Sequence, residues 1–457
     1  MRKIANRKQI NRKIWIVAIP IMLQNLIDAA VSSADVLMLN FVGQSAISAV
    51  SLANSMIGVF FMFLYGIGTG IAMLSAQYYG KGDLKTIEKI EGIGLRFSLS
   101  VALLGALLAL TVPEYLMRIY TNDAVLIELG AKYLRMIAPG LLFWAVSAVY
   151  MSILRCIDKV SVSTVLEVTA LFSNVILNAV FIFGLFGAPK LGVVGVGIAT
   201  MLSRMLQLAG CVFVSVRLRP GVRLRLKTIF TRNRVLGRDF VSMAMPAIAN
   251  DLVWALGFSA YSGILGHLGD DAVAAFSVNN VVRNLGTVMC YGIAEASGII
   301  TGQILGEGDR EQGIDAGHLC LRLSVLTGLI GGLAVMAMTP FTVHIMSLSE
   351  TASDYLRFML LINGYYIMGT AVNTTLIAGV FRAGGDSRFG FRCDLIDMWV
   401  YAVPLGLIAA FVLKLPVKWV YFLLCTDEFV KWPWVFAHFY KYGWAKNITR
   451  DTAELAN

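Results

Sequence analysis

Long apolar stretches alternate with short polar segments along almost the whole chain. Each stretch is about 20 residues or longer, which is enough for an α-helix to cross a lipid bilayer. The pattern therefore predicts an all-α polytopic membrane protein. Its twelve expected transmembrane helices lie near residues 14–38, 47–76, 92–112, 130–154, 162–184, 192–216, 242–265, 273–302, 318–340, 355–380, 395–413 and 416–440.

The chain also repeats itself. Pro20 has a counterpart in Pro246, an offset of 246 − 20 = 226, and the same offset aligns "FVGQSAISAVSLAN" at 41–54 with "HLGDDAVAAFSVNN" at 267–280. It also aligns "YGIGTGIAMLSAQYYGKGD" at 65–83 with "YGIAEASGIITGQILGEGD" at 291–309. After a one-residue slip, Arg155 in "LRCIDKVS" matches Arg382 in "FRAGGDSR". Two pseudo-symmetric six-helix lobes are expected, related by an axis along the membrane normal.

The repeat and the loop charges predict five parts. These are a cytoplasmic N-terminal segment at 1–13, an N-lobe at 14–216, a basic linker at 217–240, a C-lobe at 241–440 and a cytoplasmic tail at 441–457. Two facing lobes suggest transport by alternating access.

Composition agrees with a lipid environment. The chain is 58% hydrophobic and 14% charged, whereas soluble proteins carry about 25% charged residues. The net charge of +10 comes from basic loops such as "MRKIANRKQINRK" and "RLRPGVRLRLKTIFTRNRVLGRD". Alternate loops hold almost no Lys or Arg, which indicates cytoplasmic N- and C-termini in a plasma or inner membrane. The basic loops favour contact with anionic lipid over a nucleic-acid partner.

No catalytic constellation is visible, so an enzyme is not expected. The six cysteines and four histidines are scattered, without the spacing of a metal site or a disulfide framework. No P-loop follows a strand, so energy must come from an ion gradient and no cofactor is expected.

Asp35 stands out because it lies in the middle of the first apolar stretch. Ionisable residues inside membrane spans are expensive to bury and are functional sites by default. The alternative is a structural hydrogen bond to a neighbouring helix. Asp28 lies seven residues earlier, on the same helix face, and is a candidate relay acid.

Several stretches resemble the multidrug and toxic compound extrusion (MATE) transporters: "ADVLMLNFVGQSAISAVS", "GIGTGIAMLSAQYYGKGD", "FRAGGDSRF" and "KYGWAKNITR". The resemblance covers nearly the whole chain. It implies a monomeric secondary antiporter that exports small organic, often cationic, compounds in exchange for H⁺ or Na⁺. Within the same superfamily a lipid-linked oligosaccharide flippase is the nearest alternative, and a channel or sensor without coupled turnover is a further one.

The chain is most similar to the DinF-like branch, and this similarity implies a coupling site at Asp35, Asn174, Asn178 and Thr200. Asn174 and Asn178 are four residues apart, so their amides share one helix face. Such an all-oxygen set suits a proton or Na⁺, although interhelical hydrogen bonding is the alternative reading of both asparagines. Asn178 stands where the branch often has a second carboxylate, which favours protons over Na⁺.

Other residues are weaker candidates. The essential seventh-helix glutamate of the NorM-like branch falls on Trp254, and Tyr261 is the repeat counterpart of Asp35. Arg155 and Arg382 suit an inner gate or lipid anchoring. Near the cytoplasmic ends, Asp394 and Asp397 are expected to pair with neighbouring arginines, and Glu428 with Lys431. Candidates for relay or substrate contact are Asp28, Glu295, Asp251, Tyr65, Tyr261, Tyr291 and Trp254.

Overall fold

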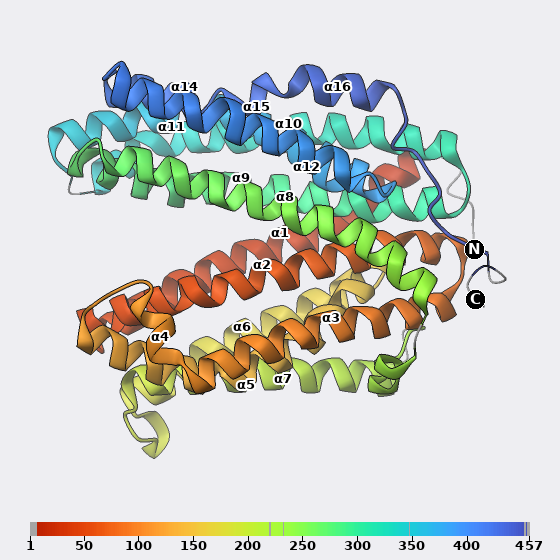
Figure 1. Ribbon diagram of the computed structural model, residues 1–457, viewed down its shortest axis with the longest axis horizontal. Coiled ribbons are helices and arrows are strands. Elements are labelled where there is room, and N and C mark those ends of the chain that lie inside the picture. Colours follow the sequence, from red (N-terminus) through yellow and green to blue (C-terminus); the bar gives the residue numbers. More distant parts are fainter. Residues whose placement is uncertain (1–6, 219–220, 232, 347, 452–453, 455–457) are drawn as a thin grey trace. The chain divides into compact units, whose positions relative to one another are not determined.

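The structure is a computed structural model that describes residues 7–218, 221–231, 233–346, 348–451 and 454. Within these residues every regular element is a helix (Figure 1). The first half contains α1 (Arg7–Asn40), α2 (Gln44–Lys81), α3 (Leu84–Thr111), α4 (Pro113–Arg118), α5 (Ala124–Cys156), α6 (Val160–Phe183), η1 (Leu185–Gly187), α7 (Gly192–Phe213), η2 (Val214–Leu218) and η3 (Leu226–Phe230).

The second half contains α8 (Arg234–Gly266), α9 (Asp270–Gly306), α10 (Arg310–Ile345), α11 (Glu350–Thr374), η4 (Thr375–Phe381), α12 (Ser387–Ile396), η5 (Asp397–Ala402), α13 (Val403–Leu407), η6 (Ile408–Val412), α14 (Val417–Leu424), α15 (Asp427–Val430) and α16 (Trp432–Tyr440). The predicted all-α polytopic fold is therefore confirmed.

Ten helical segments of the described chain are long and apolar enough to cross a membrane. The other two predicted spans are also helical but are interrupted by irregular turns or polar residues. The span expected near 355–380 is formed by α11 and continues through η4, a stretch of π-helix. The span expected near 416–440 is broken into α14, α15 and α16. Pro433 at the start of α16 cannot donate a backbone hydrogen bond to the preceding turn, which favours a break there.

The repeat is visible in local structure. Gly82 and Gly308 both have positive φ, at 83° and 88°, a backbone conformation that side chains disfavour. The next residue in each half, Asp83 or Asp309, caps the following helix by accepting a backbone N–H at 3.0 Å. The same turn chemistry therefore begins α3 and α10.

The helices group into two compact units. The N-terminal unit comprises Leu23–Tyr79, Asp83–Val241 and Arg450–Asn457. In it α5 packs on α3 and α7, and α6 packs on α7. Gly197 permits the α5–α7 approach, because a Cβ there would lie 2.7 Å from the Met136 side chain.

The C-terminal unit comprises Met1–Met22, Gly80–Gly82 and Ser242–Thr449, with α9, α10 and α11 packed on one another. The start of α1 also belongs to it, since Lys13 Nζ donates to Gln303 Oε1 at 2.7 Å. The fully buried Trp444 belongs to the same unit, which ends at Thr449. The lobe boundaries expected from the sequence stay a prediction.

Candidate functional site: two buried polar networks

The first network joins α1 to α6 in the N-terminal unit. Asn178 Nδ2 donates to Asp35 Oδ1 at 2.8 Å and to Asn174 Oδ1 at 3.2 Å. Asn174 Nδ2 in turn donates to Thr200 Oγ1 of α7 at 3.2 Å. The four residues implied by the resemblance thus form one continuous chain of hydrogen bonds across three helices. Asn178 and Asn174 are buried, whereas Asp35 and Thr200 are half-buried.

This network has spare acceptor capacity. Asn178 is 1% exposed, and its Oδ1 receives no hydrogen bond from the described residues. No basic side chain in the described part of the chain pairs with Asp35. A buried acceptor without a donor is costly, so the arrangement suits a proton or a cation arriving beside the carboxylate.

A second tier of polar residues, which the sequence analysis did not identify, lies on the same helices. Arg204 Nη1 of α7 donates to Glu167 Oε1 of α6 at 3.1 Å, and Gln207 Nε2 donates to Glu167 Oε2 at 2.7 Å. Asp28 lies within electrostatic range of both Glu167 and Arg204. Spacing could have revealed this tier. Glu167 precedes Asn174 by 174 − 167 = 7 residues, just as Asp28 precedes Asp35 by 35 − 28 = 7.

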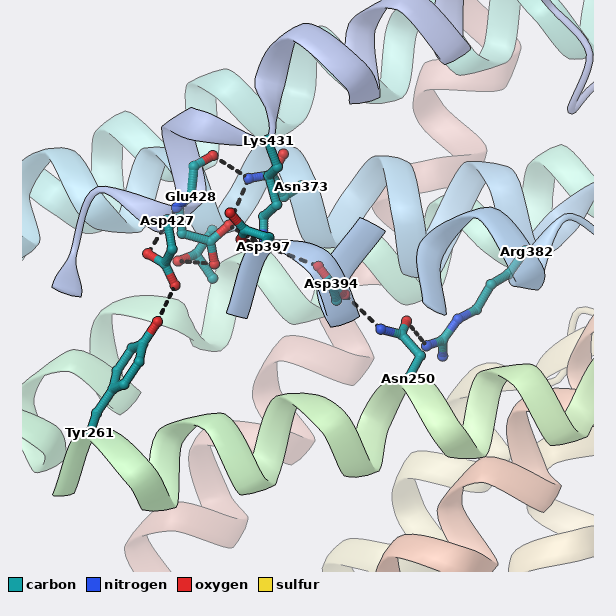
Figure 2. A network of polar contacts seen from close by, with 10 residues as sticks. Asn250, Tyr261, Asn373, Arg382, Asp394, Asp397, Asp427, Glu428 and Lys431 are labelled. Atoms are coloured by element: carbon teal, nitrogen blue, oxygen red, sulfur yellow. Dashed lines mark hydrogen bonds and ion pairs between the residues drawn. The ribbon is translucent and has the colours of Figure 1, made fainter. Parts of the chain in front are cut away.

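The second network, in the C-terminal unit, is centred on Lys431 (Figure 2). The Lys431 ammonium lies 3.1 Å from Glu428 Oε2, 3.2 Å from Asp394 Oδ1 and 3.4 Å from Asp397 Oδ2. The pairing expected between Glu428 and Lys431 is present. The two aspartates, however, belong to this cluster rather than to a pairing with neighbouring arginines. Burial of Asp394 and Asp397 against α15 brings them to the lysine.

Neutral groups hold the edges of this network. Tyr261, on α8, donates to Asp427 Oδ2 at 2.9 Å. Asn250, also on α8, donates to Asp394 Oδ2 at 2.6 Å and accepts from Arg382 Nη2 at 2.9 Å. Figure 2 shows the resulting chain from Arg382 through Asn250 and Asp394 to Lys431. The network therefore extends across α8, α12 and the broken helix at α15.

The two networks are related by the repeat. In the later part of each half the offset is 382 − 155 = 227, the slip that aligns Arg155 with Arg382. At this offset Glu167 aligns with Asp394 (167 + 227) and Arg204 aligns with Lys431 (204 + 227). Both halves thus hold an acid–base pair at matching sequence positions, but only in the second half do further carboxylates lie within ion-pair distance of the base.

The remaining sequence candidates lie in several environments. Asp251 pairs with Arg382 at 2.7 Å, whereas the matching arginine, Arg155, donates to Ser152 Oγ at 3.4 Å. Tyr261 is buried and bonded to Asp427. Tyr65 is 63% exposed. Those that are half-buried are Glu295, Tyr291 and Trp254, and Trp254 packs edge-on against Phe258.

No group of three or more His, Cys, Asp or Glu side chains within the described ranges is arranged to hold a metal ion. The six cysteines are all buried and free. The polar groups of both networks are carboxylates, amides, hydroxyls and basic side chains.

Paired six-helix repeats with polar groups inside each half define a polytopic membrane protein of the kind found among secondary transporters. The profile of the MatE family matches residues 20–180 and again residues 246–408, so its two matches start at the repeat offset of 226. The chain belongs to the MatE family, and the resemblance to MATE transporters is confirmed. It is accordingly a multi-pass membrane transporter and not an enzyme.

Named relatives span most of the chain. The "Probable multidrug resistance protein NorM" of Thermotoga maritima is 23% identical over 402 residues, covering 88% of this chain and 86% of the relative. The "Probable multidrug resistance protein YoeA" of Bacillus subtilis is 23% identical over 461 residues, covering 96% and 95%.

Solved structures show the same fold. An outward-facing multidrug resistance MATE transporter of the MOP superfamily gives a TM-score of 0.86 at 20% identity, covering 95% of this chain and 97% of its own. A MOP superfamily transporter from Pyrococcus furiosus gives 0.85 at 20% identity, covering 95% and 96%.

Proposed function

We propose that this protein is a secondary antiporter that exports small organic compounds in exchange for H⁺, with Na⁺ as the alternative coupling ion. Membership of the MatE family and the multidrug resistance names of its relatives support export of this substrate class. The basic loops support a plasma membrane location with both termini in the cytoplasm. A monomer without a nucleic-acid partner is part of the proposal.

The observation that carries the proposal is the contact between Asp35 and Asn178. The Asp35 carboxylate accepts a hydrogen bond from the buried Asn178 amide, and the oxygen of that amide receives no hydrogen bond from the described residues. If Asp35 takes up a proton, the new O–H can donate to an acceptor such as Asn178 Oδ1. Loading and unloading of the proton would then exchange hydrogen bonds within this contact between an acid and an amide.

Na⁺ fits the same residues less readily. A sodium ion needs several oxygens turned towards it, and the carboxylate of Asp35 with the oxygens of Asn174, Asn178 and Thr200 could supply them. However, the Asn178 amide presents its N–H₂ group to both Asp35 and Asn174. The amide would have to turn over, and the interhelical hydrogen bond from Asn178 to Asp35 would be lost. The arrangement therefore favours protons.

Binding of the coupling ion can drive transport only if the inward-open and outward-open states bind it with different affinities. Asp35 lies on α1, whose first part up to Met22 belongs to the C-terminal unit and whose remainder belongs to the N-terminal unit. Protonation at Asp35 alters the hydrogen bond between α1 and α6. We propose that this change biases α1 between two arrangements and so couples proton binding to alternating access.

The test is dye exchange in proteoliposomes, with a pH gradient or a Na⁺ gradient imposed separately. Wild type is compared with Asp35→Asn, which preserves the shape of the side chain but cannot carry the proton. The expected result is transport by wild type on a proton gradient and loss of about a hundredfold or more in the variant, the lower end of the range for removal of a positioned acid–base group.

Glu128→Gln is the matched control, because Glu128 is exposed and pairs only with Lys132 at 2.6 Å. It makes the same carboxylate-to-amide change away from the site and should transport like wild type. Transport driven only by Na⁺ would replace H⁺ with Na⁺ as the coupling ion. Equal transport by Asp35→Asn and wild type would refute the assigned role of Asp35.

A further inference from the structure

The geometry around Lys431 is that of a cation held by carboxylates rather than that of a simple ion pair. Lys431 is 2% exposed, and oxygens from Asp394, Asp397 and Glu428 approach its ammonium within 3.4 Å. These carboxylates come from α12, η5 and α15. A fourth acid, Asp427, is 1% exposed and adjoins Glu428 in the chain. We call Asp394, Asp397, Asp427 and Glu428 the carboxylate cage.

The cage has supports that do not depend on Lys431. Asn250 Nδ2 donates to Asp394 at 2.6 Å. Asn373 Nδ2 donates to Glu428 Oε2 at 2.6 Å and also to the Glu428 backbone carbonyl at 2.6 Å. Asp394 and Glu428 would therefore stay in place if the ammonium were removed, because neutral donors on α8 and α11 already fix them.

The cage also has more acceptor capacity than one ammonium fills. Oδ1 of the fully buried Asp397 receives no hydrogen bond from the described residues, and its Oδ2 has only the ion-pair contact with Lys431 at 3.4 Å. Asn373 is 3% exposed, and its Oδ1 also lacks a donor there. Figure 2 shows the Asn373 side chain beside Glu428 and Asp397. A bound cation or proton would satisfy buried oxygens that lack a hydrogen-bond donor.

Two nearby arginines, Arg382 and Arg283, have partners outside the carboxylate cage, so Lys431 is the cation that pairs with it. Arg382, on η4's C-terminal side, is paired with Asp251 at 2.7 Å and reaches the cage only through Asn250. Arg283, on α9, lies over the ring of Phe258 at 4.6 Å. In the part of the chain that the structure describes, no other basic side chain is paired with a cage carboxylate.

The matching place in the first half is much simpler. Arg204 pairs with one carboxylate, Glu167, and shares it with the amide of Gln207. The residues that match Asp397 and Glu428 at the offset of 227 are Ala170 and Met201. The first half therefore keeps its ion pair without counterparts of Asp397 and Glu428. A structural ion pair at this position does not require those added carboxylates.

We propose that the carboxylate cage is a monovalent-cation site that the chain fills with its own side chain, the ammonium of Lys431. In this view the C-terminal unit carries a tethered cation and takes none from solution. Removal of the ammonium opens the site to a small cation such as NH₄⁺, Na⁺ or K⁺. The inference concerns a site separate from Asp35 and does not depend on the coupling ion used there.

The test measures thermal unfolding of the purified full chain, with every variant built on Asp35→Asn so that cation binding at Asp35 does not contribute. Lys431→Met removes the ammonium and keeps most of the side-chain length. The expected result is a fall of the unfolding midpoint by roughly 5 °C or more in choline chloride, a salt whose cation is too large for the cage. Replacing choline by NH₄⁺, Na⁺ or K⁺ at equal ionic strength should restore most of that loss.

Arg204→Met is the matched control, because it removes the base at the matching sequence position, which forms an ion pair with one carboxylate, Glu167. It should show no cation-specific recovery. The double variant Lys431→Met/Asp397→Asn removes one uncompensated charge, so it should be more stable than Lys431→Met in choline chloride and depend less on small cations. If Lys431→Met alone does not fold, the double variant is still expected to fold, and the test then rests on the double variant.

Four results would overturn the proposal. The first is a Lys431→Met midpoint that no small cation raises, and the second is equal recovery in Arg204→Met. The third is stabilisation of the Asp35→Asn parent itself by a small cation, because Lys431 would then leave the cage open. The fourth is failure of the double variant to fold when Lys431→Met also fails, because the loss would then reflect packing.

Discussion

The two halves of this transporter place the same kind of ion pair at equivalent positions but use the surrounding space differently. In the first half, the Glu167–Arg204 pair lies beneath a separate network in which Asp35 has only a neutral amide as its hydrogen-bond partner. In the second half, the corresponding Asp394–Lys431 pair is merged with three more acids. Under the two proposals made above, one half leaves a carboxylate for an ion from solution, whereas the other supplies its own cation.

A smaller correspondence makes the same point. At the offset of 227, Asn174 and Thr200, which bond to each other in the first half, match Tyr401 (174 + 227) and Asp427 (200 + 227), and Tyr401 bonds instead to Thr426 at 3.0 Å. Asp35 corresponds to Tyr261, which donates to the cage acid Asp427. Matching positions therefore carry different side chains and make different contacts in the two halves.

The largest expected difference between the two networks is the loss of stability when the central charge of each is removed. Lys431→Met should lower the free energy of unfolding by about 3–5 kcal/mol, because it leaves buried anions without their cation. Asp35→Asn should lower it by less than about 1 kcal/mol, since an amide can replace the carboxylate as acceptor for Asn178. Denaturant unfolding in detergent micelles measures both.

Lys418→Met is the control for that pair of variants. Lys418 pairs with Asp354 at 2.6 Å, but both side chains are substantially exposed, so the loss should be at most about 1 kcal/mol. A cost for Asp35→Asn as large as that for Lys431→Met would show that the two networks do not differ in the way described.

A second prediction concerns the backbone at Trp444, which lies against Gly384 in the second half. Ile157 in the first half corresponds to Gly384 in the second (157 + 227), and a Cβ on Gly384 would lie 1.6 Å from the Trp444 carbonyl oxygen. Gly384→Ala should therefore destabilise the protein by about 3 kcal/mol, as overpacking against rigid backbone does. Thermal unfolding is the measurement. Gly443→Ala, with open space around its Cα, should change little.

The helix caps give a prediction in which the halves should behave alike. Asp83→Ala and Asp309→Ala each remove a side chain that accepts a helix N–H at 3.0 Å. Each should cost about 1 kcal/mol. Unfolding measurements on both variants would contradict equivalent turns if one cost were several times the other.

The smallest expected effect is a pH dependence peculiar to the second half. His438 Nε2 lies 2.8 Å from Asp386 Oδ2, and this hydrogen bond holds the pKa of Asp386 below its usual value of 3.8. A depressed pKa means that the contact's contribution to stability is present above about pH 4 and is lost as the pH falls through the lowered pKa. Unfolding midpoints between pH 6 and pH 3 should show this step in wild type.

Asp386→Asn should remove that step, and its midpoint should depend less on pH across this range. The matching residue in the first half is Lys159 (159 + 227), so no equivalent step is expected there. A step that survives in Asp386→Asn must come from other carboxylates and would contradict the assignment.

Local patterns in the sequence determined much of this protein. Apolar length predicted the membrane helices, because each helix satisfies its own backbone hydrogen bonds and needs only an apolar surface to lie in lipid. The repeat aligned the turn residues at 82–83 with those at 308–309, and both pairs precede a capped helix in the structure. The similarity to known transporters directed attention to Asp35, Asn174, Asn178 and Thr200, which prove to be in hydrogen-bonding contact.

Tertiary structure alone decided the partners of the buried charges. Helical spacing indicated the Glu428–Lys431 contact, because residues three apart share a face. No such rule could bring Asp394 to Lys431 across 431 − 394 = 37 residues, or Tyr261 to Asp427 across 166. Those contacts depend on how α8, α12 and the broken helix at α15 pack. A buried charge binds whatever partner that packing places within reach, and distance along the chain carries no information about it.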